Sequence, residues 1–234
     1  MRFSQDNVDD LLNAWPSLRR VPSTRADATV LEGRLEFVLE PPGFPPIGDC
    51  YSVRIEVPLG PTDSVPEVFE TGRRIPRDAD HHVNPNGALC LGSPWRVQQL
   101  LGRPVSLVAL VERCVIPFLY AASWREQGNE GYPFAELPHG RAGLLDDYSA
   151  ILGVEGSAAV LQALETLARR PREANKLPCP CGCGVRLGRC RYRYVLHNLR
   201  QGMKRSSFRH LRDQFKIEFP PEAPAPSSGR KLHL

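Results

Sequence analysis

The feature that most constrains this chain is a turn-rich polar stretch that ends at a single cysteine: His81-His82-Val83-Asn84-Pro85-Asn86-Gly87-Ala88-Leu89-Cys90-Leu91. Asn-Pro and Asn-Gly dipeptides both favour tight turns, so neither a helix nor a regular strand is expected to continue through it. The stretch therefore predicts a loop with a thiol at its mouth, close to imidazole and carboxamide groups.

These side chains are the groups that acyl transfer through a cysteine requires. A thiol is a nucleophile, an imidazole is a base, and both imidazole and carboxamide can donate hydrogen bonds to a developing oxyanion. The candidate catalytic residues are Cys90, His82, His81 and Asn84. Free cysteines are also among the most buried residues in proteins, and composition alone favours a cysteine that is simply packed in a loop.

The segment Asn84–Leu91 resembles the active-site segment of ubiquitin-conjugating enzymes, in which an Asn-Gly turn leads through two residues to the thioester-forming cysteine. The resemblance covers about residues 1 to 150 in element order, but only this segment is specific. It implies that Cys90 forms a thioester with the C-terminal acyl group of a partner protein. The His-Pro-Asn tripeptide of the family falls on Asp80-His81-His82, so the resemblance implies that His82 replaces the asparagine that stabilises the oxyanion.

The run His-x-Asn-Pro-x-Gly-x-x-Cys-Leu is similar to that of bacterial conjugating-enzyme-like proteins of cyclic-oligonucleotide (CBASS) antiviral defence. That resemblance implies a cGAS-like nucleotidyltransferase as acyl donor, with a ubiquitin-like protein as the second choice. The sequence contains no Gly-rich phosphate-binding loop, so activation with ATP is expected from a separate activating enzyme or by another route. A catalytically inactive conjugating-enzyme fold that binds a protein tail is the alternative.

A cysteine cluster follows in the last third of the chain, at Cys179, Cys181, Cys183 and Cys190. Interspersed glycines let the backbone turn sharply enough for several sulfurs to face one ion, and zinc prefers four thiolate or imidazole ligands. An odd cysteine count without a secretion signal argues against a disulfide framework. The cluster therefore predicts a structural zinc site, with a metal-free redox or structural thiol cluster as the alternative.

The same segment resembles the zinc motif at the C-terminus of the SecA translocase (SEC-C), which reads Cys-x-Cys, eight residues, then Cys followed by Cys or His. Cys179, Cys181 and Cys190 match that pattern, and Arg191 stands in the place of the fourth ligand. By this resemblance, either Cys183 or His197 completes the zinc site.

Charge is distributed unevenly along the chain. Through Arg170 there are 16 Lys+Arg and 22 Asp+Glu, a balance of −6, and from Pro171 onward there are 14 and 4, a balance of +10. The basic part can dock nucleic acid or an acidic protein surface, or can be a solvated basic face. The first six residues lack the apolar core of a signal peptide, and no run of 18 apolar residues exists, so a cytoplasmic protein without a membrane span is expected.

Hydrophobic periodicity predicts an α+β protein. The predicted helices are 5–15, one that begins near Pro104 and is kinked or broken at Pro117, 157–170 and 204–217. The predicted strands are 34–40, 51–57 and part of 67–75. This order of N-terminal helix, antiparallel β-meander, cysteine loop and C-terminal helices matches the ubiquitin-conjugating-enzyme-like fold, with a small zinc knuckle added. The predicted domains are 1–153, a helix and zinc module at 154–217, and a disordered tail at 218–234.

Overall fold

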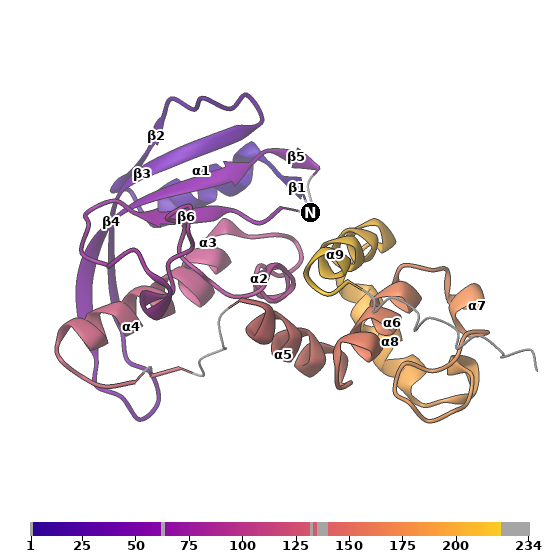
Figure 1. The fold of residues 1–234 in the computed structure, drawn as a ribbon. Helices are drawn as coiled ribbons and strands as arrows, with labels where there is room; N and C mark the ends of the chain where they lie inside the picture. Colours follow the sequence, from indigo (N-terminus) through magenta and orange to yellow (C-terminus); the bar gives the residue numbers. More distant parts are fainter. Residues whose placement is uncertain (1, 62–63, 132, 135–139, 221–234) are drawn as a thin grey trace, which may run out of the picture. The chain divides into compact units, whose positions relative to one another are not determined.

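The computed structural model describes residues 2–61, 64–131, 133–134 and 140–220. They divide into two compact units, unit 1 (Met1–Tyr148) and unit 2 (Ser149–Leu234), and the boundary falls within helix α5 (Gly140–Leu152). Figure 1 shows that strands occur in unit 1 and that unit 2 is helical. The two units are described separately below.

Unit 1 is built on a four-stranded antiparallel sheet with the strand order β2-β3-β4-β6. The strands are β2 (Leu18–Val21), β3 (Ala28–Leu39), β4 (Ile47–Pro58) and β6 (Glu67–Glu70). Since the four strands of this sheet are ordered as they follow in the chain and pair antiparallel, the predicted α+β class and antiparallel meander are confirmed. β1 (Arg2–Phe3) and β5 (Gly60–Pro61) form a separate antiparallel pair.

The strands β3 and β4 are longer than the sequence predicted and pair over their whole length, from Ala28 opposite Pro58 to Leu39 opposite Ile47. Alternate side chains point into the core, as expected for a sheet with one buried face. The inward residues of these two strands include Leu31, Leu35, Tyr51, Val53, Ile55 and Val57.

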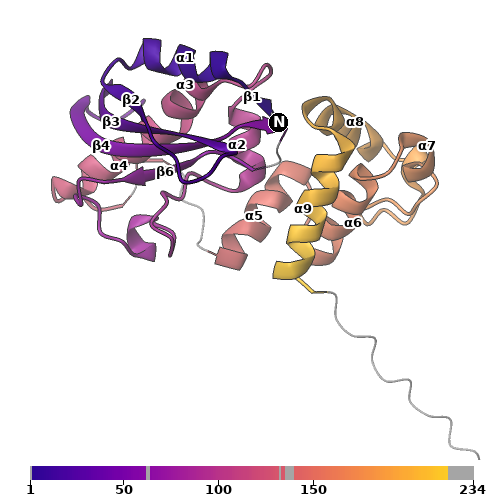
Figure 2. The same cartoon turned by 90° about the horizontal axis from the view of Figure 1, so that it is seen from above.

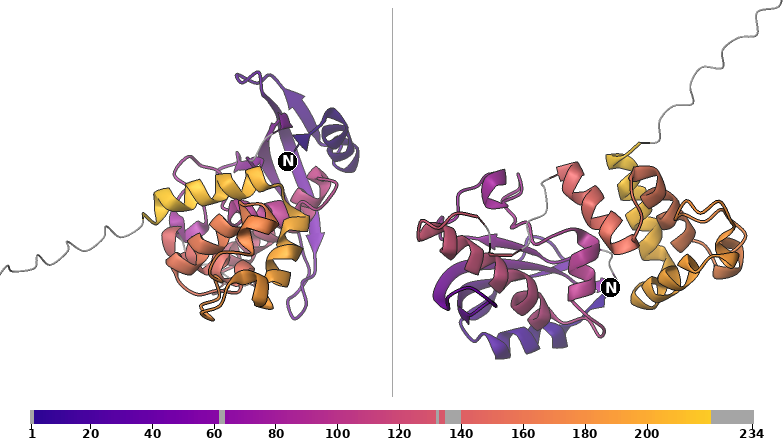
Figure 3. Two further views of the ribbon diagram at one scale, coloured as in Figure 1. Left: turned by 90° about the vertical axis from the view of Figure 1, so that its right-hand side faces the viewer. Right: turned by 90° about the horizontal axis from the view of Figure 1, so that it is seen from below.

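A helical run packs across β3 and β4 and closes the core of unit 1. It consists of α3 (Leu107–Leu110), the π-helical turn η2 (Val111–Val115) and α4 (Ile116–Glu126); the right-hand view of Figure 3 shows the run crossing the strands. The predicted start near Pro104 is wrong, because the Ser106 Oγ caps the helix by accepting from the Ala109 amide at 3.1 Å. The run is continuous from Leu107 to Glu126, so the predicted kink or break is a π turn, which ends two residues before Pro117, a residue with no N–H to donate.

By length and composition, Leu107–Glu126 is the one helix in the described residues that could cross a membrane by itself, and α5 with α6 (Ser157–Leu167) passes only as a bent pair. Just over half of the apolar window in Leu107–Glu126 is buried within the protein. The core helix of a soluble protein passes the same test, so this run is weak support for a membrane span.

The N-terminal helix α1 (Gln5–Ala14) follows the prediction closely and packs against α3. Ser4 is its N-cap, and the Ser4 amide donates to Asn7 Oδ1 at 3.0 Å. The Asn7 Nδ2 donates in turn to the Val105 carbonyl at 2.9 Å, which fixes α1 to the loop that precedes α3.

Unit 2 is a small helical cluster around α6, which contacts α7 (Pro171–Ala174), α8 (Tyr192–Gly202) and α9 (Arg205–Glu218). Figure 2 shows α9 lying along α6. The buried face of α9 carries Phe208, Leu211 and Phe215, as its spacing predicted. α9 extends one residue into the predicted tail, and residues 221–234 of that tail lie outside the described residues.

An ionic network ties three parts of unit 1 together around Arg74, which follows β6. Its guanidinium donates to Asp49 of β4 at 2.9 and 3.0 Å and to Glu126 of α4 at 2.5 Å. It also lies 4.1 Å from the centroid of the Tyr51 ring. Hydrogen bonds from Arg74, and then from Ser123, hold the pKa of Asp49 at about 2, below its ordinary value of 3.8.

Acid should therefore weaken unit 1 through the Asp49–Arg74 pair. Because the folded-state pKa of Asp49 is depressed, its contribution is complete above about pH 5 and is lost as the pH falls towards 2. Because Arg74 is partly exposed, solvent screens the pair. We therefore expect the pair to contribute about 1 to 2 kcal/mol to the free energy of unfolding of unit 1.

Tryptophan fluorescence during denaturant unfolding measures this effect, because Trp15, Trp95 and Trp124 are the only tryptophans and all lie in unit 1. The matched variant is Asp49→Asn, whose free energy of unfolding should fall less over the same pH range. Parallel pH curves for the two proteins would contradict the assignment.

Candidate active site and metal centre

The stretch that precedes Cys90 folds into a tight hairpin. The Gly87 amide donates to the Asn84 carbonyl at 2.7 Å, and the Asn84 amide donates to the Ala88 carbonyl at 2.8 Å. Asn, Pro and Gly occupy the first, second and fourth positions of the turn, which are the preferences of a type I turn. Gly87 has a φ of 86°, a conformation that glycine adopts without strain.

The hairpin is attached to the sheet at β6. The Leu89 amide donates to the Val68 carbonyl at 2.7 Å, and Ala88 forms a bridge with Phe69. The side chain of Asn86 is committed to bracing, since its Oδ1 accepts from the Ala88 amide and its Nδ2 donates to Glu67 of β6 at 2.9 Å. The cysteine loop is therefore an extension of the sheet edge.

Cys90 lies between this hairpin and helix α2 (Pro94–Leu100) and is partly exposed. Its amide donates to the His82 carbonyl at 2.8 Å. Three residues later Ser93 caps α2, and its Oγ accepts from the Arg96 amide at 3.2 Å. A thiol in this position has a fixed backbone and access to solvent.

The two candidate histidines have different surroundings. His81 ends the short 3-10 helix η1 (Ala79–His81), and its Nδ1 lies 2.7 Å from Asp78 Oδ1. The hydrogen bond from His81 is the main cause of the lowered pKa of Asp78. The backbone of His82 has the left-handed α conformation (φ 53°, ψ 40°), which costs a non-glycine residue roughly 1–2 kcal/mol.

Within the described residues, His82 and Arg73 are the two non-glycine residues with positive φ. The structure thus brings the backbone of His82 onto Cys90 and turns the His81 ring towards Asp78. Asn84 opens the hairpin turn, with its side chain exposed.

A buried carboxylate lies next to α2 that the sequence did not reveal as a site residue. The side chain of Asp147, from α5, is fully buried and forms an ion pair with Arg96. Among the residues that the structure describes, none forms a hydrogen bond with the Asp147 Oδ2. The loss of Arg96 would leave this charge buried and unpaired, so the pair fixes α2 against α5.

The cysteine cluster of unit 2 is carried on a second tight hairpin. The Cys179 amide donates to the Val185 carbonyl and the Leu187 amide to the Leu177 carbonyl, both at 2.9 Å. Between these arms, Gly182 and Gly184 have φ values of 77° and 76°, which turn the chain back on itself. Three of the four cysteines therefore lie at or near the hairpin tip.

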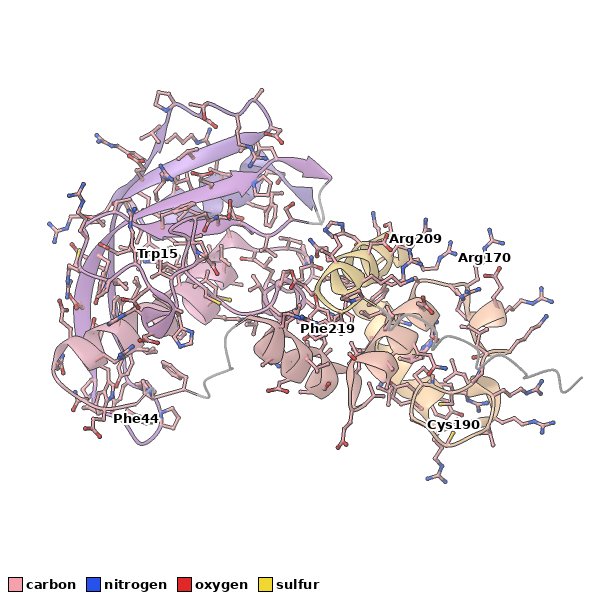
Figure 4. All side chains as sticks on the ribbon, in the orientation of Figure 1. Trp15, Phe44, Arg170, Cys190, Arg209 and Phe219 are labelled. Carbon is pink, nitrogen blue, oxygen red and sulfur yellow. The ribbon has the colours of Figure 1, made fainter. Side chains whose placement is uncertain are left out.

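The fourth cysteine lies at the start of α8. The chain passes from the hairpin through the 3-10 turn η3 (Leu187–Arg189) to Cys190, whose Sγ accepts from the Tyr192 amide at 3.4 Å. All seven cysteines of the chain are free thiols. Figure 4 labels Cys190, at the end of unit 2 that carries the cysteine hairpin.

The four sulfurs of Cys179, Cys181, Cys183 and Cys190 lie within 4.8 Å of one another. The Cys179–Cys181 and Cys181–Cys190 sulfurs are 3.2 and 3.7 Å apart. Tetrahedral ligands at the usual Zn–S distance would be separated by about 3.8 Å. The thiols that converge can therefore hold one metal ion.

His197, the other predicted ligand, is not in this group. It lies on the exposed side of α8, with its Nε2 3.3 Å from Gln201 Nε2. The fourth converging thiol is that of Cys183, whose pKa is lowered to about 7, chiefly by a hydrogen bond from the Val185 amide and then by Cys181. Spacing alone left this choice open.

Many cations of unit 2 are exposed on its surface, and Figure 4 shows Arg170 and Arg209 pointing outward from it. The residues of α9 at helical spacing, Arg205, Arg209, Arg212 and Lys216, form one basic stripe. Docking of nucleic acid on this surface stays a prediction.

Comparison with known proteins identifies no relative of this chain. No family model matches the chain, and neither a curated protein nor a solved structure matches it significantly.

Proposed function

We propose that this chain is a cysteine acyltransferase of the ubiquitin-conjugating type, with a ubiquitin-conjugating-enzyme-like fold over unit 1. The observation that carries the proposal is Cys90 itself, a partly exposed thiol whose backbone is held by His82 at the end of an Asn-Pro-Asn-Gly hairpin. The order of N-terminal helix, antiparallel meander, cysteine loop and helices supports it as well.

The proposed reaction has two steps. The Cys90 thiolate attacks the activated C-terminal carbonyl of a donor protein, a C–S bond forms, and the activating group leaves. An acceptor amine then attacks the thioester carbonyl, the tetrahedral intermediate expels the Cys90 thiolate, and an amide remains. Following the resemblance, the first choice of donor is a cGAS-like nucleotidyltransferase of an antiviral defence system, activated by a separate enzyme.

We assign the oxyanion donor to His82 ahead of His81 and Asn84. The resemblance places His82 where the family carries its oxyanion donor, and the His81 ring already faces Asp78. The strained backbone of His82 is the kind of outlier that occurs at functional sites. A neutral imidazole can donate one hydrogen bond to the oxyanion.

Replacement of Cys90 should abolish thioester formation without unfolding unit 1. Cys90→Ala should give no thiol-labile adduct with the donor, whereas Cys90→Ser should give a more stable oxyester. The matched controls are Cys50→Ala and Cys114→Ala, which should both load like wild type; burial raises the pKa of Cys114 to about 11. Intact-protein mass spectrometry of the adduct is the measurement, and equal loading by all three alanine variants would favour the inactive binding module.

Replacement of His82 should separate loading from discharge. His82→Ala should load Cys90 normally and slow discharge to an amine by about 10²–10³-fold, which is typical for the loss of one oxyanion donor. His82→Asn restores a donor and suits the left-handed backbone, so it should retain most of the discharge rate. Single-turnover assays measure both steps, and an equal loss of both in His82→Ala would mean that His82 only braces the loop.

We further propose that the metal held by the four thiols of unit 2 is zinc, bound for structure. Zinc accepts four thiolates in a tetrahedral array, and four protein ligands leave no open position for a substrate. The proposal rests on the convergence of the four sulfurs. When bound, zinc would link the hairpin tip to the start of α8.

Removal of the metal should unfold the cysteine hairpin and α8 and spare unit 1. Because structural zinc binding is coupled to folding, a chelator should lower the helical circular dichroism signal but leave tryptophan fluorescence, which reports on unit 1, unchanged. Elemental analysis should find one zinc per chain in wild type and in His197→Ala. Cys183→Ser should hold less zinc, and a normal zinc content in that variant would exclude Cys183 as a ligand.

A further inference from the structure

Lysine is absent from the first 175 residues of the chain. Unit 1 contains fourteen arginines and no lysine, whereas the sixteen cations from Ser149 onward comprise twelve arginines and four lysines: Lys176, Lys204, Lys216 and Lys231. The chain therefore uses lysine, but never in the unit that carries Cys90.

Three of the arginines of unit 1 contact the segments on either side of Cys90. The Arg77 guanidinium lies 3.8 Å from the position that a Cβ on Gly87 would occupy, so it rests against the hairpin turn. Arg125 donates to the Asp80 carbonyl in η1, and Arg96 lies in the first turn of α2 and pairs with Asp147. Guanidinium groups of unit 1 therefore lie close to the cysteine loop, and no lysine of unit 1 does.

Arginine and lysine differ sharply as neighbours of a thioester. A guanidinium stays protonated in proteins and is not a nucleophile, whereas a lysine amine can lose its proton and attack an acyl group. A lysine on the loop would face the thioester at an effective concentration on the order of millimolar or more. It would therefore transfer the acyl group onto the chain itself.

We propose that the arginine-only composition of unit 1 protects acylated Cys90 from self-transfer, so that the acceptor amine comes from a second molecule. This inference rests on the proposed acyl transfer at Cys90. It names the class of acceptor, an amine in trans, and gives the cations around the loop a common chemical reason.

The test charges the full chain with a biotinylated peptide thioester, from which the Cys90 thiolate displaces the small thiol. The wild-type adduct should remain labile to thiols and hydroxylamine until it hydrolyses, and free lysine added in excess should convert it to a peptide–lysine amide. Arg77→Lys should consume its own thioester at least about tenfold faster than wild type and carry a thiol-resistant amide on the new lysine.

The matched control is Arg19→Lys. Arg19 is exposed on β2, the strand at the opposite edge of the sheet from β6 and the cysteine hairpin. The thioester of Arg19→Lys should decay at the wild-type rate. This result would show that self-transfer depends on the position of the lysine and not on the number of lysines.

The outcomes separate the two proposals. If the wild-type chain takes up no labile adduct beyond that of Cys90→Ala, the acyl-transfer proposal fails and the inference fails with it. If wild type loads Cys90 but then forms a thiol-resistant amide on any of its own lysines, the inference alone is overturned. An Arg77→Lys thioester as long-lived as that of wild type overturns it equally.

Discussion

The hydrogen bond from the Cys90 amide to the His82 carbonyl is the constraint on which the candidate active site depends. It joins the end of η1 to the second arm of the hairpin, and the neighbouring Leu89 amide joins that arm to β6. Cys90 is thus outside any strand, yet its backbone is fixed on both sides. Such preorganisation lets a reacting group hold its geometry without help from bound substrate.

The cysteine hairpin of unit 2 is held in place by different interactions. Few side chains of the cysteine hairpin and its exit are buried, chiefly Cys179, Pro180 and Leu187, so an apolar core cannot fix this segment. Small modules with too little core are commonly held by metals or disulfides. A metal ion held by the four converging thiols would therefore add a constraint to the two backbone hydrogen bonds that close the hairpin.

The sequence predicted elements well where burial follows a simple period. The pairing of β3 with β4 buries alternate residues, and α9 buries Phe208, Leu211 and Phe215, so both could be read directly. The hairpin before Cys90 could be predicted for a different reason, since Asn, Pro and Gly each favour their own position in the turn.

Other elements gave no such signal. α8 buries only Tyr192 and Leu196, which is too narrow a stripe to recognise. In α5, the consecutive residues Asp147 and Tyr148 are both buried, because Arg96 pairs with a carboxylate 51 positions away. That pair, like the choice of Cys183 over His197 as the converging residue, depends on tertiary geometry that spacing does not contain.

Tyr192 has a consequence for unit 2 that follows from its two ends. Its amide donates to the sulfur of Cys190, and its buried hydroxyl donates to the Leu152 carbonyl at the last residue of α5. The first residue of α8 therefore connects the thiol cluster to the end of α5. If oxidation moves the Cys190 sulfur, α8 loses an acceptor at its start, and the hydroxyl bond of Tyr192 to Leu152 is then left to hold this end of α8.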